Sequence, residues 1–353
     1  MSRTILIMAG GTGGHIYPAI AVAEVLKARG WKVVWLGSKA GMEASIVPRH
    51  GYEIEFIRFG GLRGKGPVRL ALLPVNLLFA FWQSARVIFR VRPDVVLGMG
   101  GYIAFPGGMM AAFFRRPLVL HEQNAIAGLA NRVLAEVADR VLVAFPKALR
   151  KSTWTGNPVR ASIADVAPPE QRYANRSGPL AVLVIGGSLG ARALNEALPQ
   201  ALALLPPQTR PALRHQAGTQ HAVQLQQRYR EASVDAEVVP FIEDMAQAYA
   251  AADLVICRAG ATTVAELAAA GVASVLVPFP HAVDDHQSAN ARFLSESAAA
   301  VLLPQRELTP RKLADLIAGF TRAQLLEMAK KARALGKPDA AESVAGHCMA
   351  MTG

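Results

Sequence analysis

The sequence predicts two α/β domains, each built on a doubly wound parallel sheet. Short apolar runs alternate with helical stretches along the whole chain, which is the order of βαβ units. The runs are apolar on consecutive residues, as expected for strands that are buried on both faces of a parallel sheet. At 353 residues, 52% of them hydrophobic and 18% charged, the chain is globular in composition and too long for one ordinary core.

The expected strands fall into two sets. In the first half they lie at 4–9, 32–36, 53–59, 94–99, 117–121 and 140–145. In the second half they lie at 180–185, 237–241, 253–257, 273–278 and 299–303. Helical stretches such as 18–29 and 262–270 connect strands within each half. Because ligands of doubly wound domains bind beyond the carboxyl ends of the strands, the loops that follow these strands are the candidate sites.

The boundary between the domains is expected within Thr155-Gly156-Asn157-Pro158-Val159-Arg160, after which a Pro-rich polar stretch begins. We therefore expect an N-terminal domain at 1–157 and a C-terminal domain at 158–336. The last residues, 337–353, are helical and alanine-rich in pattern. They could return to pack on the first domain.

The chain is strongly basic, with a formal net charge of +12 and a sequence pI near 10.1. Such an excess attracts nucleic acid, phosphorylated substrates or an anionic membrane surface. Aromatic residues are only 7% of the chain, and no basic run is interleaved with aromatics, which argues against a nucleic-acid-binding module. Cys257 and Cys348 form no spaced pair of the zinc-binding or redox kind, so we expect free thiols in a reducing cytosol. The N-terminus leads at once into a short apolar run, and we expect no signal peptide.

A glycine loop follows the first expected strand. Gly10-Gly11-Thr12-Gly13-Gly14-His15 opens the first helix, where backbone N–H groups and the helix N-terminus can meet an anion. A nicotinamide-dependent oxidoreductase is the obvious rival, but Ile16 stands where the dinucleotide fingerprint needs its third glycine. The second strand also ends Leu36-Gly37-Ser38, without an acid to hold a ribose. No cofactor is therefore expected.

Two further glycine clusters follow other strands. Gly186-Gly187-Ser188-Leu189-Gly190 repeats the arrangement after the first strand of the second half. Gly98-Met99-Gly100-Gly101-Tyr102 ends the fourth strand of the first half. Two phosphate-type loops, one in each domain, are much more specific than one, although the third cluster could also serve close backbone packing.

Seven segments together resemble the MurG family, the undecaprenyl-diphospho-muramoylpentapeptide β-N-acetylglucosaminyltransferases. In order, they are the Gly10–His15 loop with Pro18, Gly100-Gly101-Tyr102, His121-Glu122-Gln123-Asn124, Thr155 to Arg160, the Gly186–Gly190 loop, Cys257 to Glu266, and Asp285-His286-Gln287-Ser288-Ala289-Asn290-Ala291. The resemblance spans nearly the entire chain. It implies the two-domain GT-B glycosyltransferase architecture with a cleft between the domains.

The resemblance implies transfer of N-acetylglucosamine from UDP-N-acetylglucosamine to a lipid-linked muramoyl-pentapeptide acceptor in peptidoglycan synthesis. The N-terminal domain would bind the acceptor and the membrane, and the C-terminal domain would bind the UDP-sugar. The expected location is the cytoplasmic face of the bacterial cell membrane, with cell-wall and division machinery as candidate partners. A UDP-N-acetylglucosamine epimerase of the same fold, or another UDP-sugar-dependent glycosyltransferase, remains the alternative.

The resemblance also assigns substrate contacts. Ser188 and Arg160 would hold the diphosphate, and Glu266 would accept hydrogen bonds from two ribose hydroxyls. Backbone groups near Ile242 would read the uracil edge. The implied positions are Thr12, Gly13, Gly14, Asn124, Arg160, Ser188, Ile242, Ala261, Thr262, Thr263, Val264, Ala265, Glu266 and Gln287.

The implied reaction inverts the sugar configuration in a single displacement, so it needs a general base and stabilisation of the leaving diphosphate. His15 is the candidate base because imidazole titrates near working pH, and Glu122 is the runner-up. His15 could instead pack the helix start or steer the diphosphate. The chain has no Asp-x-Asp motif, and Asp284-Asp285 is its only adjacent aspartate pair, so we expect a metal-independent enzyme.

The segment from Leu70 to Trp82 is the most apolar in the chain. Between Arg69 and Arg86 it offers 16 residues, which is fewer than the roughly 20 that a spanning helix needs. The flanking cations suit anionic headgroups; they are Arg63, Lys65, Arg69, Arg86 and Arg90. The segment therefore predicts peripheral attachment to an anionic membrane, with a core helix as the alternative.

Overall fold

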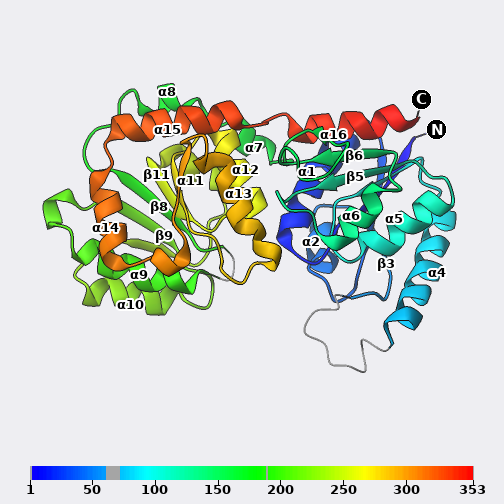
Figure 1. Ribbon diagram of the computed structural model, residues 1–353, viewed down its shortest axis with the longest axis horizontal. Coiled ribbons are helices and arrows are strands. Elements are labelled where there is room, and N and C mark those ends of the chain that lie inside the picture. The colour runs from blue at the N-terminus through cyan, green and yellow to red at the C-terminus, as the bar shows by residue number, and fades with distance from the viewer. Residues whose placement is uncertain (1, 61–71, 188–189, 353) are drawn as a thin grey trace. The chain divides into compact units, whose positions relative to one another are not determined.

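The protein folds into two α/β units (Figure 1). The computed structural model describes residues 2–60, 72–187 and 190–352. Unit 1 comprises Met1–Arg160 and Asp339–Gly353, and unit 2 comprises Ala161–Pro338. The boundaries predicted from the sequence lie at 157/158 and 336/337. Each unit has its own sheet and its own hydrophobic core.

The sheet of unit 1 has seven parallel strands in the order β3-β2-β1-β4-β5-β6-β7. The strands are β1 (Thr4–Met8), β2 (Lys32–Gly37), β3 (Glu53–Phe56), β4 (Val95–Gly98), β5 (Leu118–Glu122), β6 (Arg140–Val143) and β7 (Thr153–Trp154). Alternate residues of β1 enter different cores: Ile5 and Ile7 pack on one face, and Leu6 and Met8 on the other. Burial on both faces is the reason that this strand reads as an unbroken apolar run.

Helices cover both faces of this sheet (Figure 1). They are α1 (Gly13–Ala28), α2 (Glu43–Arg49), α4 (Leu73–Val91), α5 (Ala104–Phe113), α6 (Leu129–Ala135) and α16 (Ala340–Met349), with the 3-10 helix η4 (Ala350–Thr352). The C-terminal helix α16 packs beside α1, and its Val344, Ala345 and Cys348 enter the core on that face. On the other face, α4 and α5 lie against each other.

The sheet of unit 2 has six parallel strands in the order β10-β9-β8-β11-β12-β13. The strands are β8 (Ala181–Ile185), β9 (Ala212–Gln216), β10 (Glu237–Val239), β11 (Leu254–Cys257), β12 (Ser274–Leu276) and β13 (Ala300–Leu302). The α-helices are α7 (Ala161–Ala164), α8 (Pro169–Tyr173), α9 (Arg192–Ala203), α10 (Ala222–Glu231), α11 (Met245–Ala251), α12 (Ala261–Ala270), α13 (His286–Ser295), α14 (Pro310–Gly319) and α15 (Arg322–Leu335). The 3-10 helices are η1 (Pro207–Thr209), η2 (Val283–Asp285) and η3 (Gln305–Glu307).

The predicted fold class, two doubly wound parallel domains, is confirmed, and every expected apolar run contains a strand. Two strands, β9 and the two-residue β7, lie outside the predicted apolar runs. β9 is not an apolar run because it carries Arg214, His215 and Gln216, yet it lies between β8 and β10. His215 is fully buried there, with Nδ1 2.8 Å from the hydroxyl oxygen of Tyr229. A tertiary hydrogen bond thus pairs one ring nitrogen of this side chain inside the sheet, while Nε2 has no hydrogen-bond partner among the described residues.

Candidate active site

Each sheet reverses its strand order at one point, between β1 and β4 in unit 1 and between β8 and β11 in unit 2. Doubly wound sheets bind ligands at the carboxyl ends of the strands that flank this point. The three glycine clusters lie there, because residues 10–14 follow β1, residues 98–102 end β4 and residues 186–190 follow β8. Each unit therefore has a candidate site at its switch point.

Glycine is required where the two loops of unit 1 meet. Gly101 has φ +82°, and a Cβ at this position would lie 2.3 Å from the carbonyl oxygen of Gly10. Gly100 has φ +90°, and a Cβ there would lie 2.9 Å from Nδ1 of His15. The loops can approach each other and the imidazole this closely because neither position carries a side chain.

A buried carboxylate, which the sequence analysis missed, supports the first glycine loop. Glu43 of α2 is fully buried. Its Oε2 accepts a hydrogen bond from the N–H of Gly11 at 3.1 Å, and its Oε1 accepts one from the N–H of Ser38 at 2.9 Å. The strand β2 itself ends without an acid, and α2 brings the carboxylate of Glu43 back to the loop that follows it. Both of its oxygens bind backbone N–H groups of the surrounding loops.

His15 begins a hydrogen-bonded chain of side chains. Its Nδ1 lies 2.8 Å from Oε1 of Gln123. Nε2 of Gln123 lies 3.1 Å from Nδ1 of His121, whose Nε2 lies 2.9 Å from the carbonyl oxygen of Gly156. His15 is partly exposed, whereas His121 and Gln123 are buried. Burial lowers the pKa of His121 to about 4, so this imidazole is neutral near pH 7.

Glu122 organises the loop between β5 and α6. The residue is only 2% exposed. Its Oε1 accepts hydrogen bonds from the backbone N–H of Asn124 at 2.8 Å and from the side-chain amide of Asn124 at 3.3 Å. Its Oε2 accepts from Nδ2 of Asn131 at 2.8 Å and from the N–H of Gly128 at 3.4 Å. This carboxylate fixes the position of Asn124, a predicted sugar contact.

Three predicted positions form the start of α1. Thr12 is the exposed N-cap residue, and Gly13 and Gly14 are the first two residues of the helix. Within the described residues, the Thr12 side chain caps no N–H group of the helix. The first N–H groups of an α-helix have no partner inside the helix, and the helix dipole adds positive charge there. This end of α1 therefore suits phosphate or sugar oxygens.

The glycine loop of unit 2 lies against the chain that follows β9. Gly190 has φ +78°, and a Cβ at this position would lie 2.1 Å from the carbonyl oxygen of Ala217. The N–H of Gly186 donates to the carbonyl oxygen of Gln216 at 3.2 Å. Helix α9 begins directly after this loop. Ser188, the predicted diphosphate contact, lies outside the described residues.

Glu266 lies on α12, which follows β11 at the switch point of unit 2. It is 9% exposed, and its Oε2 accepts a hydrogen bond from the hydroxyl of Tyr249 at 3.0 Å. Near the start of the same helix, the buried hydroxyl oxygen of Thr262 has no hydrogen-bond partner among the described residues. The other predicted positions here, Ala261, Thr263, Val264 and Ala265, occupy the first turns of α12. One helix thus brings together N–H groups, a hydroxyl and a carboxylate.

The remaining predicted positions lie on loops and helix starts. Ile242 is buried in the loop after β10. Gln287 is the second residue of α13, and its Oε1 accepts a hydrogen bond from the N–H of Phe279 at 2.9 Å. Arg160 ends the first segment of unit 1 and is partly exposed.

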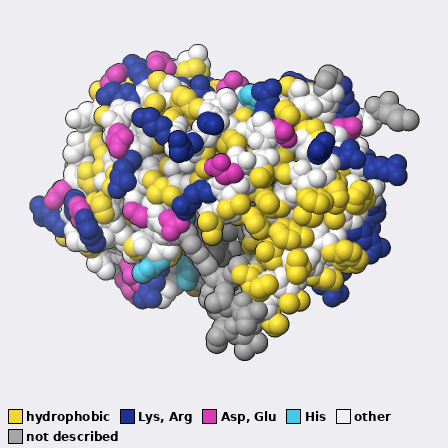
Figure 2. Space-filling model, turned by 45° about the vertical axis from the view of Figure 1, so that its right-hand side comes forward, with side chains coloured by type: hydrophobic (Ala, Val, Ile, Leu, Met, Phe, Trp, Pro, Cys, Tyr) yellow, Lys and Arg dark blue, Asp and Glu magenta, His cyan; other side chains and the backbone are white. Residues whose placement is uncertain are grey.

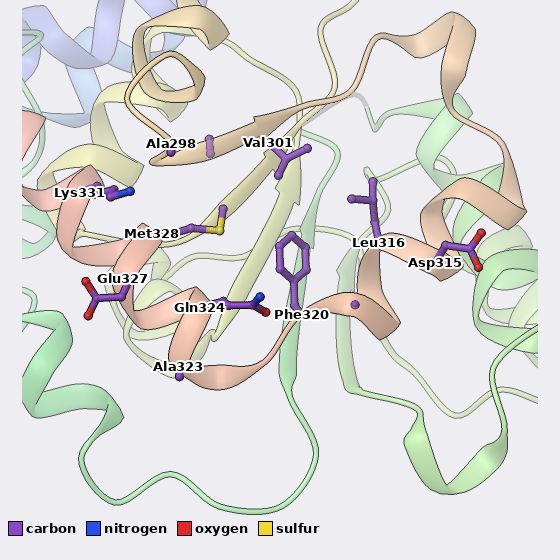
Figure 3. A pocket seen from close by; sticks show the side chains of 12 residues that line it. Ala298, Val301, Asp315, Leu316, Phe320, Ala323, Gln324, Glu327, Met328 and Lys331 are labelled. Atoms are coloured by element: carbon purple, nitrogen blue, oxygen red, sulfur yellow. The ribbon is translucent and has the colours of Figure 1, made fainter.

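A cavity of about 660 Å³ lies in another part of unit 2 (Figure 3). Side chains of β13, α14 and α15 line it, among them Leu316, Phe320 and Met328. Strand β13 is at the edge of its sheet. Because no predicted site position within the described residues lines this cavity, it is separate from the switch-point site.

Helix α4 carries an exposed apolar surface. Its Ala80, Ser84, Val87 and Ile88 are buried against the sheet. Its opposite side and the end of α5 expose large apolar side chains, and Figure 2 shows such side chains gathered on one face with Lys and Arg at the margin. These residues, here called the apolar surface, are Val75, Leu78, Phe79, Trp82, Phe89 and Phe113. Among the described residues of the predicted segment from Leu70 to Trp82, only Ala80 is buried, so the core face of α4 lies mainly after this segment. Leu70, Arg63, Lys65 and Arg69 lie outside the described residues.

In the described part of the chain, no helix has the length and apolarity to cross a bilayer. Over the same residues, no group of three or more His, Cys, Asp or Glu side chains is arranged to hold a metal ion.

Comparisons with known proteins agree with this geometry. Residues 5–143 match the glycosyltransferase family 28 N-terminal domain, and residues 181–344 match the glycosyltransferase family 28 C-terminal domain. A UDP-N-acetylglucosamine--N-acetylmuramyl-(pentapeptide) pyrophosphoryl-undecaprenol N-acetylglucosamine transferase from Ralstonia nicotianae is 64% identical, over 99% of this chain and 97% of that protein. A protein of the same name from Cupriavidus metallidurans is 61% identical, over 100% of this chain and 99% of that protein.

Solved structures show the same architecture. The crystal structure of Acinetobacter baumannii MurG superposes with a TM-score of 0.87 at 40% sequence identity, over 99% of each chain. CalG4, the calicheamicin glycosyltransferase, superposes with a TM-score of 0.66 at 16% identity, over 99% of this chain and 98% of that one, which shows the shared fold alone. The predicted GT-B fold is confirmed, and the chain belongs to glycosyltransferase family 28 and, within it, to the MurG family.

Proposed function

We infer that this protein transfers N-acetylglucosamine from UDP-N-acetylglucosamine to undecaprenyl-diphosphate-linked muramoyl-pentapeptide, a step of peptidoglycan synthesis. The observation that carries this inference is the identity of 61 to 64% over nearly the full chain with transferases named for that reaction. Both switch-point sites also carry glycine loops that lead into helix N-termini, which suits a diphosphate-containing donor and acceptor. An epimerase of the same architecture is the alternative, and it would form an epimerised UDP-sugar without an acceptor.

Unit 2 is the proposed site of the UDP-sugar. The start of α12 offers N–H groups to the diphosphate, and Glu266 offers carboxylate oxygens to the ribose hydroxyls. Tyr249 supports this role because its hydroxyl donates to one oxygen of Glu266 and so orients the carboxylate. Gln287 and Asn124 would contact sugar hydroxyls, Ile242 the uracil, and Ser188 and Arg160 the diphosphate.

The proposed chemistry is one displacement with His15 as general base. As the acceptor oxygen bonds to the anomeric carbon, its proton passes to Nε2 of His15. The bond from that carbon to the diphosphate breaks on the opposite face, so the α-linked sugar becomes β-linked. The departing diphosphate keeps the electron pair, and helix N-termini together with Arg160 stabilise the charge.

The apolar surface is the proposed membrane contact. Trp82 is 57% exposed and Phe113 is 73% exposed, which is costly for large apolar side chains in water. Arg86, Arg90 and Arg115 are exposed on the same two helices or directly after them, and cations of this kind attract anionic headgroups. The protein would thus attach peripherally at the cytoplasmic face of the cell membrane, where division proteins are candidate partners.

The test is release of UDP with and without a short-chain lipid-linked muramoyl-pentapeptide, in the presence and absence of EDTA. We expect release that depends on the acceptor, survives EDTA, and is lost in His15→Ala, whereas Glu266→Ala weakens donor binding. Release without acceptor, or an epimerised UDP-sugar, would overturn the assignment. Complete loss in EDTA with recovery in magnesium would overturn the metal-independent mechanism alone.

A further inference from the structure

We propose that Gln123 is a positioning residue that holds His15 in one tautomer, with the proton on Nδ1 and a lone pair on Nε2. This proposal rests on the proposed role of His15 as general base. A neutral imidazole carries one proton on either nitrogen, and only the unprotonated nitrogen accepts a proton. The tautomer of His15 therefore decides which of its nitrogens can act.

Two backbone carbonyl oxygens determine which nitrogen carries each proton in the series of hydrogen bonds from His15 to Gly156. Nε2 of Gln123 lies 3.1 Å from the carbonyl oxygen of His121, and a carbonyl oxygen only accepts hydrogen bonds. This end of the Gln123 amide must therefore be the NH2 group. The oxygen Oε1 is then the end that faces His15, at 2.8 Å from Nδ1. Since this oxygen also only accepts, Nδ1 of His15 carries the proton.

The hydrogen bonds of His121, at the other end of this series, indicate the same orientation of the Gln123 amide. Nε2 of His121 lies 2.9 Å from the carbonyl oxygen of Gly156, so this nitrogen carries the proton. Because burial keeps His121 neutral, its Nδ1 has a lone pair and accepts from Nε2 of Gln123 at 3.1 Å. The amide is thus held from both sides in one orientation, because a flip would turn its oxygen toward the carbonyl oxygen and the Nδ1 lone pair of His121, where no proton is left to share.

Packing keeps the pair in place. His121 is 0% exposed and Gln123 is 1% exposed, so water does not compete for these hydrogen bonds. Gly100 lies beside the hydrogen bond between His15 and Gln123. A Cβ at Gly100 would lie 2.9 Å from Nδ1 of His15 and 3.2 Å from Oε1 of Gln123. Nε2 of His15 remains the nitrogen available to an acceptor hydroxyl without any rotation of the ring.

The amide differs chemically from the carboxylate that orients histidine in many hydrolases. An amide oxygen fixes the tautomer but carries no net charge, so it does not stabilise the imidazolium as a carboxylate does. In this arrangement Gln123 orients His15 without stabilising its charge. The positive charge that develops on His15 must be stabilised by other groups or removed by rapid proton transfer to water.

The experiment is 15N NMR of histidine-labelled protein, with the His15 signals assigned from the His15→Gln variant. We expect Nδ1 of His15 protonated and Nε2 unprotonated in the wild type at a pH where the ring is neutral. In Gln123→Met, which preserves size but removes the hydrogen bonds of the amide to His15 and His121, we expect a mixture of tautomers and a fall in kcat on the order of 10- to 100-fold. The KM for UDP-N-acetylglucosamine should stay the same, because Gln123 is not a donor contact.

A wild-type His15 protonated on Nε2 would overturn the proposal, and so would the same tautomer in wild type and Gln123→Met. The wild-type spectrum decides the matter even if the variant does not fold. Because the spectrum needs no substrate, it separates this proposal from the transferase assignment. If the tautomer is as expected but His15→Gln retains full turnover, Gln123 has no positioning role in catalysis.

Discussion

Glu266 provides the most direct test of the donor site. If its carboxylate accepts hydrogen bonds from two ribose hydroxyls, Glu266→Gln removes one acceptor and the charge from the other. Hydrogen bonds to charged groups contribute about 1.5–3 kcal/mol each. We therefore expect UDP to bind about 2 kcal/mol more weakly, which is about a 30-fold higher Kd. The substitution keeps the size of a side chain that is only 9% exposed, so packing should be preserved.

The assay is isothermal titration calorimetry with UDP and with its 2′,3′-dideoxy analogue, which lacks both hydroxyls. In wild type the analogue should bind more weakly than UDP, whereas in Glu266→Gln the two ligands should bind alike. Tyr249→Phe removes the 3.0 Å hydrogen bond that orients Glu266 and should raise the Kd for UDP about fivefold. Glu327→Gln, an exposed glutamate on α15 paired with Lys330, is the matched control and should change nothing.

The result that would refute the reasoning is equal weakening of both ligands by Glu266→Gln. Such a result would mean that Glu266 acts on the diphosphate or on the fold rather than on the ribose. Unchanged binding of UDP would remove Glu266 from the donor site.

Two further predictions concern stability and membrane attachment. Burial lowers the pKa of His215 to about 3, below the unfolded value near 6.5, so the unfolded chain binds a proton first as the pH falls. The contribution of His215 to the free energy of unfolding should be fully present above about pH 6.5. Below that pH it should fall by about 1.4 kcal/mol per pH unit. The double variant His215→Leu/Tyr229→Phe should show a smaller drop in Tm between pH 6.5 and 5; an identical drop contradicts the assignment. Trp82→Ala with Phe113→Ala should weaken binding to anionic vesicles about 30-fold, since each side chain contributes about 1 kcal/mol when buried in the interface. Val223→Ala, an exposed apolar residue on α10, is the control, and undiminished vesicle binding by the double variant would contradict a role for the apolar surface.

The sequence alone predicted most of the fold because its signals are local. A strand buried on both faces must be apolar at consecutive positions, and this property identified β1 through β6 and five of the strands of unit 2. The motif order also pointed to the family, and the comparisons confirmed it. The same local rule missed β9, since His215 is accommodated there by a hydrogen bond to Tyr229, whose position no local pattern predicts.

The site residues likewise fall into those that the sequence predicted and those that only the tertiary structure identified. The glycine loops, His15 and Glu266 could be chosen from sequence because each lies next to a strand end or within a motif. Tertiary structure alone decided what Glu43 and Gln123 do, because their partners are Gly11 and His15, which lie far away along the chain. Likewise, only burial of Val87 and Ile88 showed which side of α4 faces the core and which side is exposed. Hydrogen bonds between distant segments and the choice of a buried face arise when strands assemble, so no local pattern of residues can specify them.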